Sequence, residues 1–330
     1  MNLEKNLEEL KEEIERRQYK LSPGMAFIIR EPTVREIIAA TFRDRVVHHL
    51  IYRGISEYWD KHFIYDSYSC RVGKGTHFGI KRMSRFMRGV SNNYTQEAWV
   101  MKLDIEGYFM HMRRELVWEL CRGGLEKMEI NKKEKELLNY LLPIVILANP
   151  LEEVKIKGRR ADWDDLPRSK SLFYAPEGCG LPIGNLTSQL FSNIYLNELD
   201  KYARYELGFR YYGRYVDDFI LMSRDKRRLT ETREMIRDFF KERLGLTLHP
   251  KKMYLQLVKY GVDFLGARIR PYYVLPGKRL VKGFRKAEEG KGEGEKNETR
   301  ERSYQSYLGH LGQFRSWRLR EKKGCLGEVW

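Results

Sequence analysis

Two adjacent aspartates, Asp217 and Asp218, lie between two short apolar runs in the sequence YYGRYVDDFILM at residues 211–222. The Tyr, Val, Phe and Ile residues on both sides are typical of β-strands, and acidic residues between such strands are typical of a hairpin turn. The sequence therefore predicts a rigid hairpin with two carboxylates at its tip. Carboxylate oxygens hold hard cations such as Mg²⁺. An ordinary acidic surface turn is the alternative.

A third carboxylate follows another predicted strand. Residues 99–105, WVMKLDI, alternate in the manner of a strand, and Asp104 lies near the end of this run. Two-metal phosphoryl transfer needs carboxylates from separate elements around two cations about 3.5–4 Å apart. We therefore predict a site for two Mg²⁺ ions, in which Asp104 and Asp217 bind the metals and Asp218 assists them.

The composition indicates which class of molecule the protein binds. The 330 residues carry a formal net charge of +16, and 42% of them are hydrophobic. A positive surplus of this size indicates a polyanionic partner, usually nucleic acid. No run approaches 18 apolar residues, so we expect no membrane partner. Four widely spaced cysteines and a charged N-terminal stretch predict reduced thiols and a cytoplasmic protein.

Two structural elements are predicted near the N-terminus, a helix and a β-hairpin. Residues 3–18 have leucine and isoleucine at helical spacing, which predicts an amphipathic helix that packs on the next domain or docks a partner protein. Residues 26–40 predict two short strands with a turn at Pro32. This hairpin carries Arg30 and Arg35, whose guanidinium groups match phosphate oxygens, although a solvated pair of arginines is the alternative.

Several segments together resemble reverse transcriptases. The YVDD hairpin resembles the YxDD turn of these polymerases, and residues 41–49, TFRDRVVHH, resemble the TxRDRVVQ segment of bacterial enzymes such as those of group II introns. In that family the arginine six residues before the threonine contacts the incoming nucleotide, which implies this role for Arg35 rather than Arg30. Residues 68–77 resemble a glycine turn near the template, and residues 262–266 resemble a turn that supports the primer terminus.

The resemblance also implies roles for residues around the carboxylates. Phe109 corresponds to the steric gate that excludes a ribose 2′-hydroxyl. Lys252 corresponds to a lysine facing the pyrophosphate leaving group, with a solvated lysine as the alternative. Residues 180–193, GLPIGNLTSQLFSN, resemble the motif beneath the templating base pair and predict a loop that enters a helix. The substrate-binding residues implied there are Ile183, Gly184 and Gln189.

One departure within this motif indicates a particular family. Most reverse transcriptases have PQG where this chain has PIG, and LPIGNLTSQ is similar to the reverse transcriptases of diversity-generating retroelements. The segment at 163–173, WDDLPRSKSLF, is similar to the same family. The resemblance implies template RNA, a primer or cDNA, dNTPs and a small basic accessory protein as partners, with misincorporation opposite template adenines. Alternatives are a group II intron or retron enzyme, or a catalytically idle nucleic-acid-binding scaffold.

The implied fold is an α+β right-hand polymerase with a ferredoxin-like palm, fingers and a small helical thumb. We expect an N-terminal helix at 1–25, fingers and palm at 26–270, and a thumb at 271–330. Within the thumb, residues 278–302 are rich in Lys, Glu, Gly and Arg, which predicts a solvated basic loop. Residues 304–320 predict a basic, aromatic helix.

Overall fold

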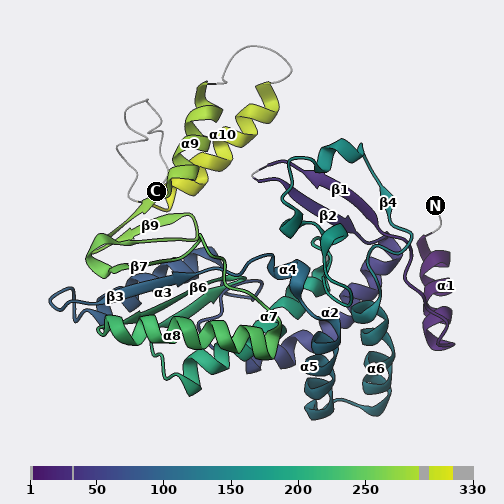
Figure 1. Ribbon diagram of the computed structural model, residues 1–330. Coiled ribbons are helices and arrows are strands. Elements are labelled where there is room, and N and C mark those ends of the chain that lie inside the picture. The colour runs from purple at the N-terminus through teal and green to yellow at the C-terminus, as the bar shows by residue number, and fades with distance from the viewer. Residues whose placement is uncertain (1–2, 32, 290–296, 315–330) are drawn as a thin grey trace.

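The centre of the fold is an antiparallel sheet with strand order β5-β6-β3-β7 (Figure 1). The structure, a computed structural model, describes residues 3–31, 33–289 and 297–314. The four strands are β3 (Trp99–Leu103), β5 (Tyr212–Tyr215), β6 (Asp218–Ser223) and β7 (Tyr254–Leu257). Helix α7 (Leu186–Lys201) precedes β5 and ends the long connection from β3, which also contains the helices and strand β4 of the fingers; α8 (Lys226–Phe239) connects β6 to β7. This βαββαβ order and this sheet are ferredoxin-like, which confirms the predicted palm.

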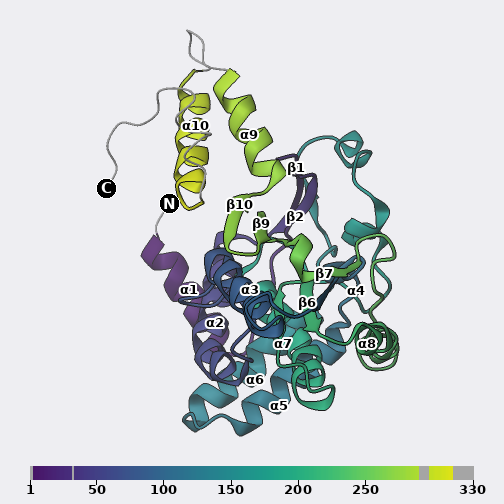
Figure 2. The ribbon, with the colours of Figure 1, turned by 90° about the vertical axis from the view of Figure 1, so that its left-hand side faces the viewer.

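Both faces of this sheet are covered, because side chains alternate along each strand. On one face Met101, Leu103 and Phe219 pack in the main core together with residues of α7 and α8. On the other face Val100 and Ile220 pack against α3 (Thr76–Val90). Figure 2 shows α3 on the surface that this view presents. The sheet is therefore held rigidly from both sides, which fixes the strand ends that carry the acidic residues.

The fingers contain the predicted hairpin. Strands β1 (Met25–Ile29) and β2 (Arg35–Ala39) pair antiparallel, and the short strand β4 (Lys155–Ile156) adds to β1 in parallel. Four helices lie beneath this sheet (Figure 1). They are α1 (Leu3–Glu15), α2 (Phe42–His62), α5 (Arg114–Lys127) and α6 (Lys132–Leu147). The predicted N-terminal helix is confirmed over Leu3–Glu15, and its Leu10 is buried in the main core.

The structure of the thumb differs from the loop predicted for residues 278–302. A three-stranded sheet leads into two adjacent helices; its strands are β8 (Val262–Phe264), β9 (Ala267–Arg270) and β10 (Tyr273–Pro276). The helices are α9 (Lys278–Glu289) and α10 (Asn297–Gly312). The solvated loop predicted for 278–302 is therefore wrong for both helical parts, while residues 290–296 lie outside the described residues. The predicted helix at 304–320 is helical to Gly312, and residues 315–320 also lie outside them.

The physical reason is a sparse apolar stripe that the high charge of the segment concealed. Leu280, Phe284 and Ala287 recur three and four residues apart, so they share one face of α9. Phe284 is buried there with Tyr304 and Leu311 of α10, and the rings of Phe284 and Tyr304 stack at 5.3 Å. A few apolar residues at helical spacing were enough to pair two charged helices.

Two further predictions concern the whole chain. Among the described residues, no helix has the length and apolar character needed to cross a membrane. Cys70, Cys121 and Cys179 carry free thiols, as predicted, and Cys325 lies outside the described residues.

Candidate active site

Strand register brings the predicted carboxylates to one edge of the palm sheet. Leu103 of β3 pairs with Phe219 of β6, so Asp104 follows opposite Asp218, the first residue of β6. In the hairpin Tyr215 pairs with Asp218, which leaves Val216 and Asp217 as the turn. Val216 has a φ of 55°, in the left-handed region that a tight turn requires. The predicted hairpin is confirmed, with Asp217 at its tip.

Two lysines neutralise two of the three acids. The Nζ of Lys252 lies 3.1 Å from Oδ1 and 3.3 Å from Oδ2 of Asp104. The Nζ of Lys102 lies 2.7 Å from Oδ2 of Asp218. Lys252 was predicted to face the leaving group, and its side chain is half exposed beside the acids. Lys102 was missed as a site residue, although its position two residues before Asp104 places both side chains on one face of β3.

Burial and neighbouring charges shift the pKa values of Asp217 and Asp218. Burial raises the pKa of Asp217 to about 6, and the negative charge of Asp104 adds to this shift. Burial also raises the pKa of Asp218, while Lys102 opposes that shift. A carboxylate that is buried beside another carboxylate favours a bound cation, because the cation relieves both costs.

The residues present fit a divalent-cation site. Oδ1 of Asp218 is buried and has no hydrogen-bond partner among the described residues. Those residues contain no ready-made group of three or more His, Cys, Asp or Glu arranged around a metal. Mg²⁺ commonly takes one or two carboxylates and completes its shell with water and substrate phosphates, so it does not require such a group.

The predicted gate residue and the PIG motif contact the same apolar cluster. We call Ala26, Ile38, Met110 and Leu172 the fingers cluster; all four are buried, and half-buried Phe109 and Ile183 pack against it. Phe109 lies on α4 (Tyr108–His111), which follows Asp104 closely in the chain. The structure therefore brings Phe109 and Ile183 to the same apolar cluster. Gly184 adopts a φ of 125° and approaches Ile37, whereas Gln189 is exposed on α7.

The two predicted arginines differ in their surroundings. Arg30 donates to Asp165 over 2.7 Å and to Asp162 over 3.4 Å, both on the segment that follows α6. Arg35 is exposed, and its Nε donates to the Thr33 hydroxyl over 3.2 Å. In the described part of the chain no carboxylate pairs with Arg35. The two arginines therefore differ: Arg30 is paired with two acids, whereas the guanidinium of Arg35 contacts only the Thr33 hydroxyl among the described residues.

A buried arginine beneath the turn was not predicted. Arg214 of β5 is fully buried, and its guanidinium donates to both carboxylate oxygens of Asp200, at 2.7 and 2.6 Å. Its Nη1 also donates to the carbonyl of Val216 over 3.0 Å. The same side chain reaches Asn193 on α7 and Ser67 in the loop before α3. One charged group thus connects the catalytic turn to α7 and to that loop. An arginine inside an otherwise apolar strand was the only sequence signal.

Comparison with known proteins agrees with this geometry. Residues 30–269 match the family model described as reverse transcriptase (RNA-dependent DNA polymerase). The chain belongs to the reverse transcriptase family. This reverse transcriptase is 24% identical over 268 residues to Protein YkfC of Escherichia coli (strain K12), an alignment that covers 72% of this chain and 63% of YkfC. The chain thus spans less than two thirds of the length of that relative.

Solved telomerases share the fold. The telomerase of Candida albicans, in complex with the TWJ fragment of telomeric RNA, superposes with a TM-score of 0.56 at 11% identity and covers 93% of this chain and 59% of its own. Apo telomerase from Candida tropicalis gives a TM-score of 0.52 at 13% identity, covering 79% of this chain and 50% of its own. At these identities the likeness shows the right-hand polymerase fold alone.

We predict that Arg214→Met lowers the free energy of unfolding by about 3–5 kcal/mol, because it leaves Asp200 buried without its counter-ion. Arg214→Met combined with Asp200→Leu removes both charges, so it should recover much of that loss. Urea unfolding followed by circular dichroism measures both variants. A loss below about 1 kcal/mol for Arg214→Met alone would show that the pair contributes little.

We also predict that the metal-free protein loses stability as the pH rises from about 4 to above 6. The folded-state pKa of Asp217 lies above its unfolded value of 3.8, so its contribution is full at low pH and is lost as the pH passes about 6. A shift of this size corresponds to at most about 3 kcal/mol. Chemical denaturation in EDTA across this range tests it. Asp217→Asn should flatten the profile, and an unchanged profile would contradict the assignment.

Proposed function

We propose that this reverse transcriptase is an RNA-directed DNA polymerase that adds dNTPs to the 3′-hydroxyl of a primer. The observation that carries the proposal is the meeting of Asp104, Asp217 and Asp218 at one edge of a ferredoxin-like sheet. These acids come from two separate strands and a turn, as two-metal phosphoryl transfer requires. Primer extension on an RNA template in Mg²⁺ tests it directly.

In this proposal, different residues of the chain bind the metals, the phosphates and the sugar. Asp104 and Asp217 would hold two Mg²⁺ ions, with Asp218 beside them. Bound Mg²⁺ supplies activation of the primer oxygen and neutralises charge on the phosphates. Lys252 can leave Asp104 and pair with the leaving phosphates instead, because its half-exposed ammonium is carried on a flexible four-carbon side chain. Phe109 limits the space beside the sugar, and Arg35 offers an unpaired guanidinium to the triphosphate.

We further propose that the enzyme belongs to the diversity-generating retroelement type and acts in the cytoplasm. Support comes from LPIGNLTSQ and WDDLPRSKSLF, two segments that both contribute to the fingers cluster, through Ile183 and Leu172 respectively. In this proposal the enzyme copies a structured template RNA with a small basic accessory protein and makes errors opposite template adenines.

We predict that Asp104→Asn or Asp217→Asn abolishes primer extension and leaves RNA binding intact. An amide keeps the size of the side chain but lacks the negative charge that the cations need. Extension is measured on an RNA template with Mg²⁺, and binding by fluorescence anisotropy. Glu57→Gln, which changes an exposed acid paired only with Lys61, is the matched control and should extend normally. Near-normal extension by either aspartate variant would refute the metal assignment.

We predict that Ile183→Gln lowers misincorporation opposite template adenine. Isoleucine offers only shape to the nascent base pair, and apolar contacts discriminate by ~10–200-fold, whereas a polar site that pairs with the substrate reaches ~10⁴–10⁵. Errors opposite each template base are counted for both proteins at matched extension rates. An unchanged error rate opposite adenine would mean that Ile183 only packs on the fingers cluster and that fidelity is set elsewhere.

A further inference from the structure

The segment at 151–177, between α6 and α7, is held firmly along its inner side. Glu36 of β2 is 2% exposed and accepts three hydrogen bonds from this segment. The donors are the Trp163 indole at 2.6 Å, the Ser171 hydroxyl at 2.7 Å and the Leu172 backbone N–H at 2.6 Å. Hydrogen bonds to a buried carboxylate are among the stronger ones in proteins. We call this segment the fingers segment; its Trp163, Ser171 and Leu172 are fixed to β2 through Glu36.

Its outer side is basic and aromatic at residues 168–174, where Arg168 and Lys170 are exposed and no acidic residue occurs. The rest of the segment carries both signs of charge: Lys155, Lys157, Arg159 and Arg160 alternate with Glu152, Glu153, Asp162, Asp164, Asp165 and Glu177. Two aromatic rings also protrude, with Phe173 40% and Tyr174 60% exposed. The guanidinium of Arg168 lies 5.1 Å from the centre of the Tyr174 ring. Within the described residues no carboxylate pairs with Arg168 or Lys170, in contrast to Arg227 and Arg237 of α8, which pair with glutamates.

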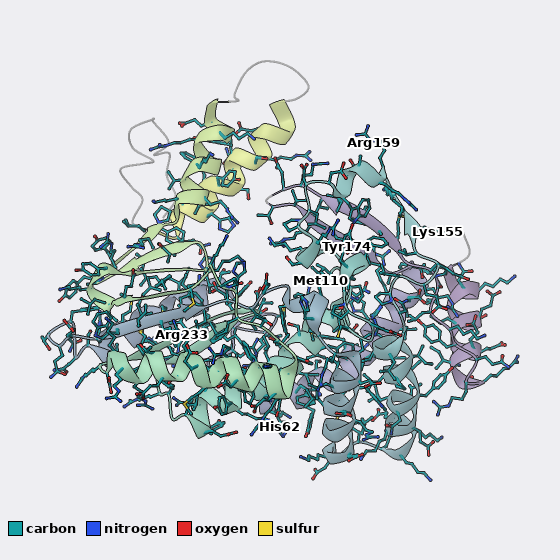
Figure 3. All side chains as sticks on the ribbon, in the orientation of Figure 1. His62, Met110, Lys155, Arg159, Tyr174 and Arg233 are labelled. Carbon is teal, nitrogen blue, oxygen red and sulfur yellow. The ribbon has the colours of Figure 1, made fainter. Side chains whose placement is uncertain are left out.

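This outer surface lies beside the catalytic edge. The carbonyl of Ser169 is so close to Gly107 that a Cβ there would lie 2.6 Å from it. Gly107 lies in the chain between Asp104 and Phe109. Figure 3 shows Tyr174 directly above Met110 of α4 and nearer to the thumb helices than Lys155. A strand that reaches the acids from the fingers therefore passes close to Arg168, Lys170 and Tyr174.

We propose that Tyr174, with Arg168 and Lys170, forms a platform for the uncopied, single-stranded part of the template RNA. This inference rests on the proposed polymerase function. Exposed aromatic rings stack on unpaired bases of any sequence, and neighbouring basic groups contact the phosphates. Bases inside a duplex are already stacked on each other, so a protruding ring suits a single strand better than the duplex product. The positive charge argues against an apolar protein partner.

The proposal is tested by binding with two RNA templates annealed to the same DNA primer, with template overhangs of one and ten nucleotides. Affinities are measured by fluorescence anisotropy without dNTPs, so the result does not depend on catalysis. The longer overhang should bind wild type roughly 5- to 100-fold more tightly for one stacked base. Tyr174→Ala should lose most of that gain while its affinity for the one-nucleotide overhang stays unchanged. Tyr174→Phe should keep it.

Two matched comparisons separate stacking from charge. A ten-nucleotide overhang with abasic sites keeps its phosphates but has no bases to stack. The wild-type protein should therefore gain as little affinity from this overhang as Tyr174→Ala gains from the normal one. The double variant Arg168→Gln, Lys170→Gln should make the affinity for the ten-nucleotide overhang less dependent on salt. The slope of log affinity against log salt concentration should fall by about 0.7 for each lost phosphate contact. Tyr205→Ala removes another exposed tyrosine, 72% exposed after α7, and should behave as wild type.

The proposal is overturned if Tyr174→Ala keeps the full gain, or if it weakens both templates equally. Failure of the polymerase proposal is distinguishable, because it appears as absent primer extension on the one-nucleotide overhang, whatever the binding result.

Discussion

The buried ion pair of Arg214 and Asp200 is the contact on which the acidic edge of the palm, with Asp104, Asp217 and Asp218, depends. Removing two charges from water costs several kcal/mol per ion, and only near-ideal geometry offsets that cost. Here the guanidinium donates to both oxygens of Asp200, and Tyr212 adds a third hydrogen bond to this carboxylate at 2.6 Å. The remaining donors of Arg214 hold the Val216 carbonyl, so the turn that carries Asp217 is tied to the interior of the palm.

A rigid turn matters because the acids above it repel each other. Burial and the charge of Asp104 raise the pKa of Asp217, and these unfavourable interactions persist only where the surrounding structure prevents relaxation. Lys102 and Lys252 compensate part of the negative charge in the metal-free protein. Each of these lysines therefore pairs with an acid of the metal site that we propose.

The fingers also contain a buried charged side chain that is satisfied by several hydrogen bonds. Glu36 is a buried carboxylate that three donors of the fingers segment satisfy, and Arg30 adds ion pairs at the edge of that segment. These contacts seat Leu172 against the cluster that also receives Phe109 and Ile183. The positions of Phe109 and Ile183 thus depend in part on the hydrogen bonds that Glu36 accepts from the fingers segment.

The sequence alone was enough to predict three of the four palm strands, β3, β5 and β6, and the YVDD hairpin, because period-two alternation and turn chemistry are local signals. It did not predict β7. It did not determine α9, whose few apolar residues have meaning only against α10. Tertiary structure alone decided that Lys252 meets Asp104 across 148 residues, that Lys102 pairs with Asp218, and that Arg30 is committed to acids while Arg35 is not. Such pairings follow from strand register and from which groups are buried together, and neither is written in local spacing.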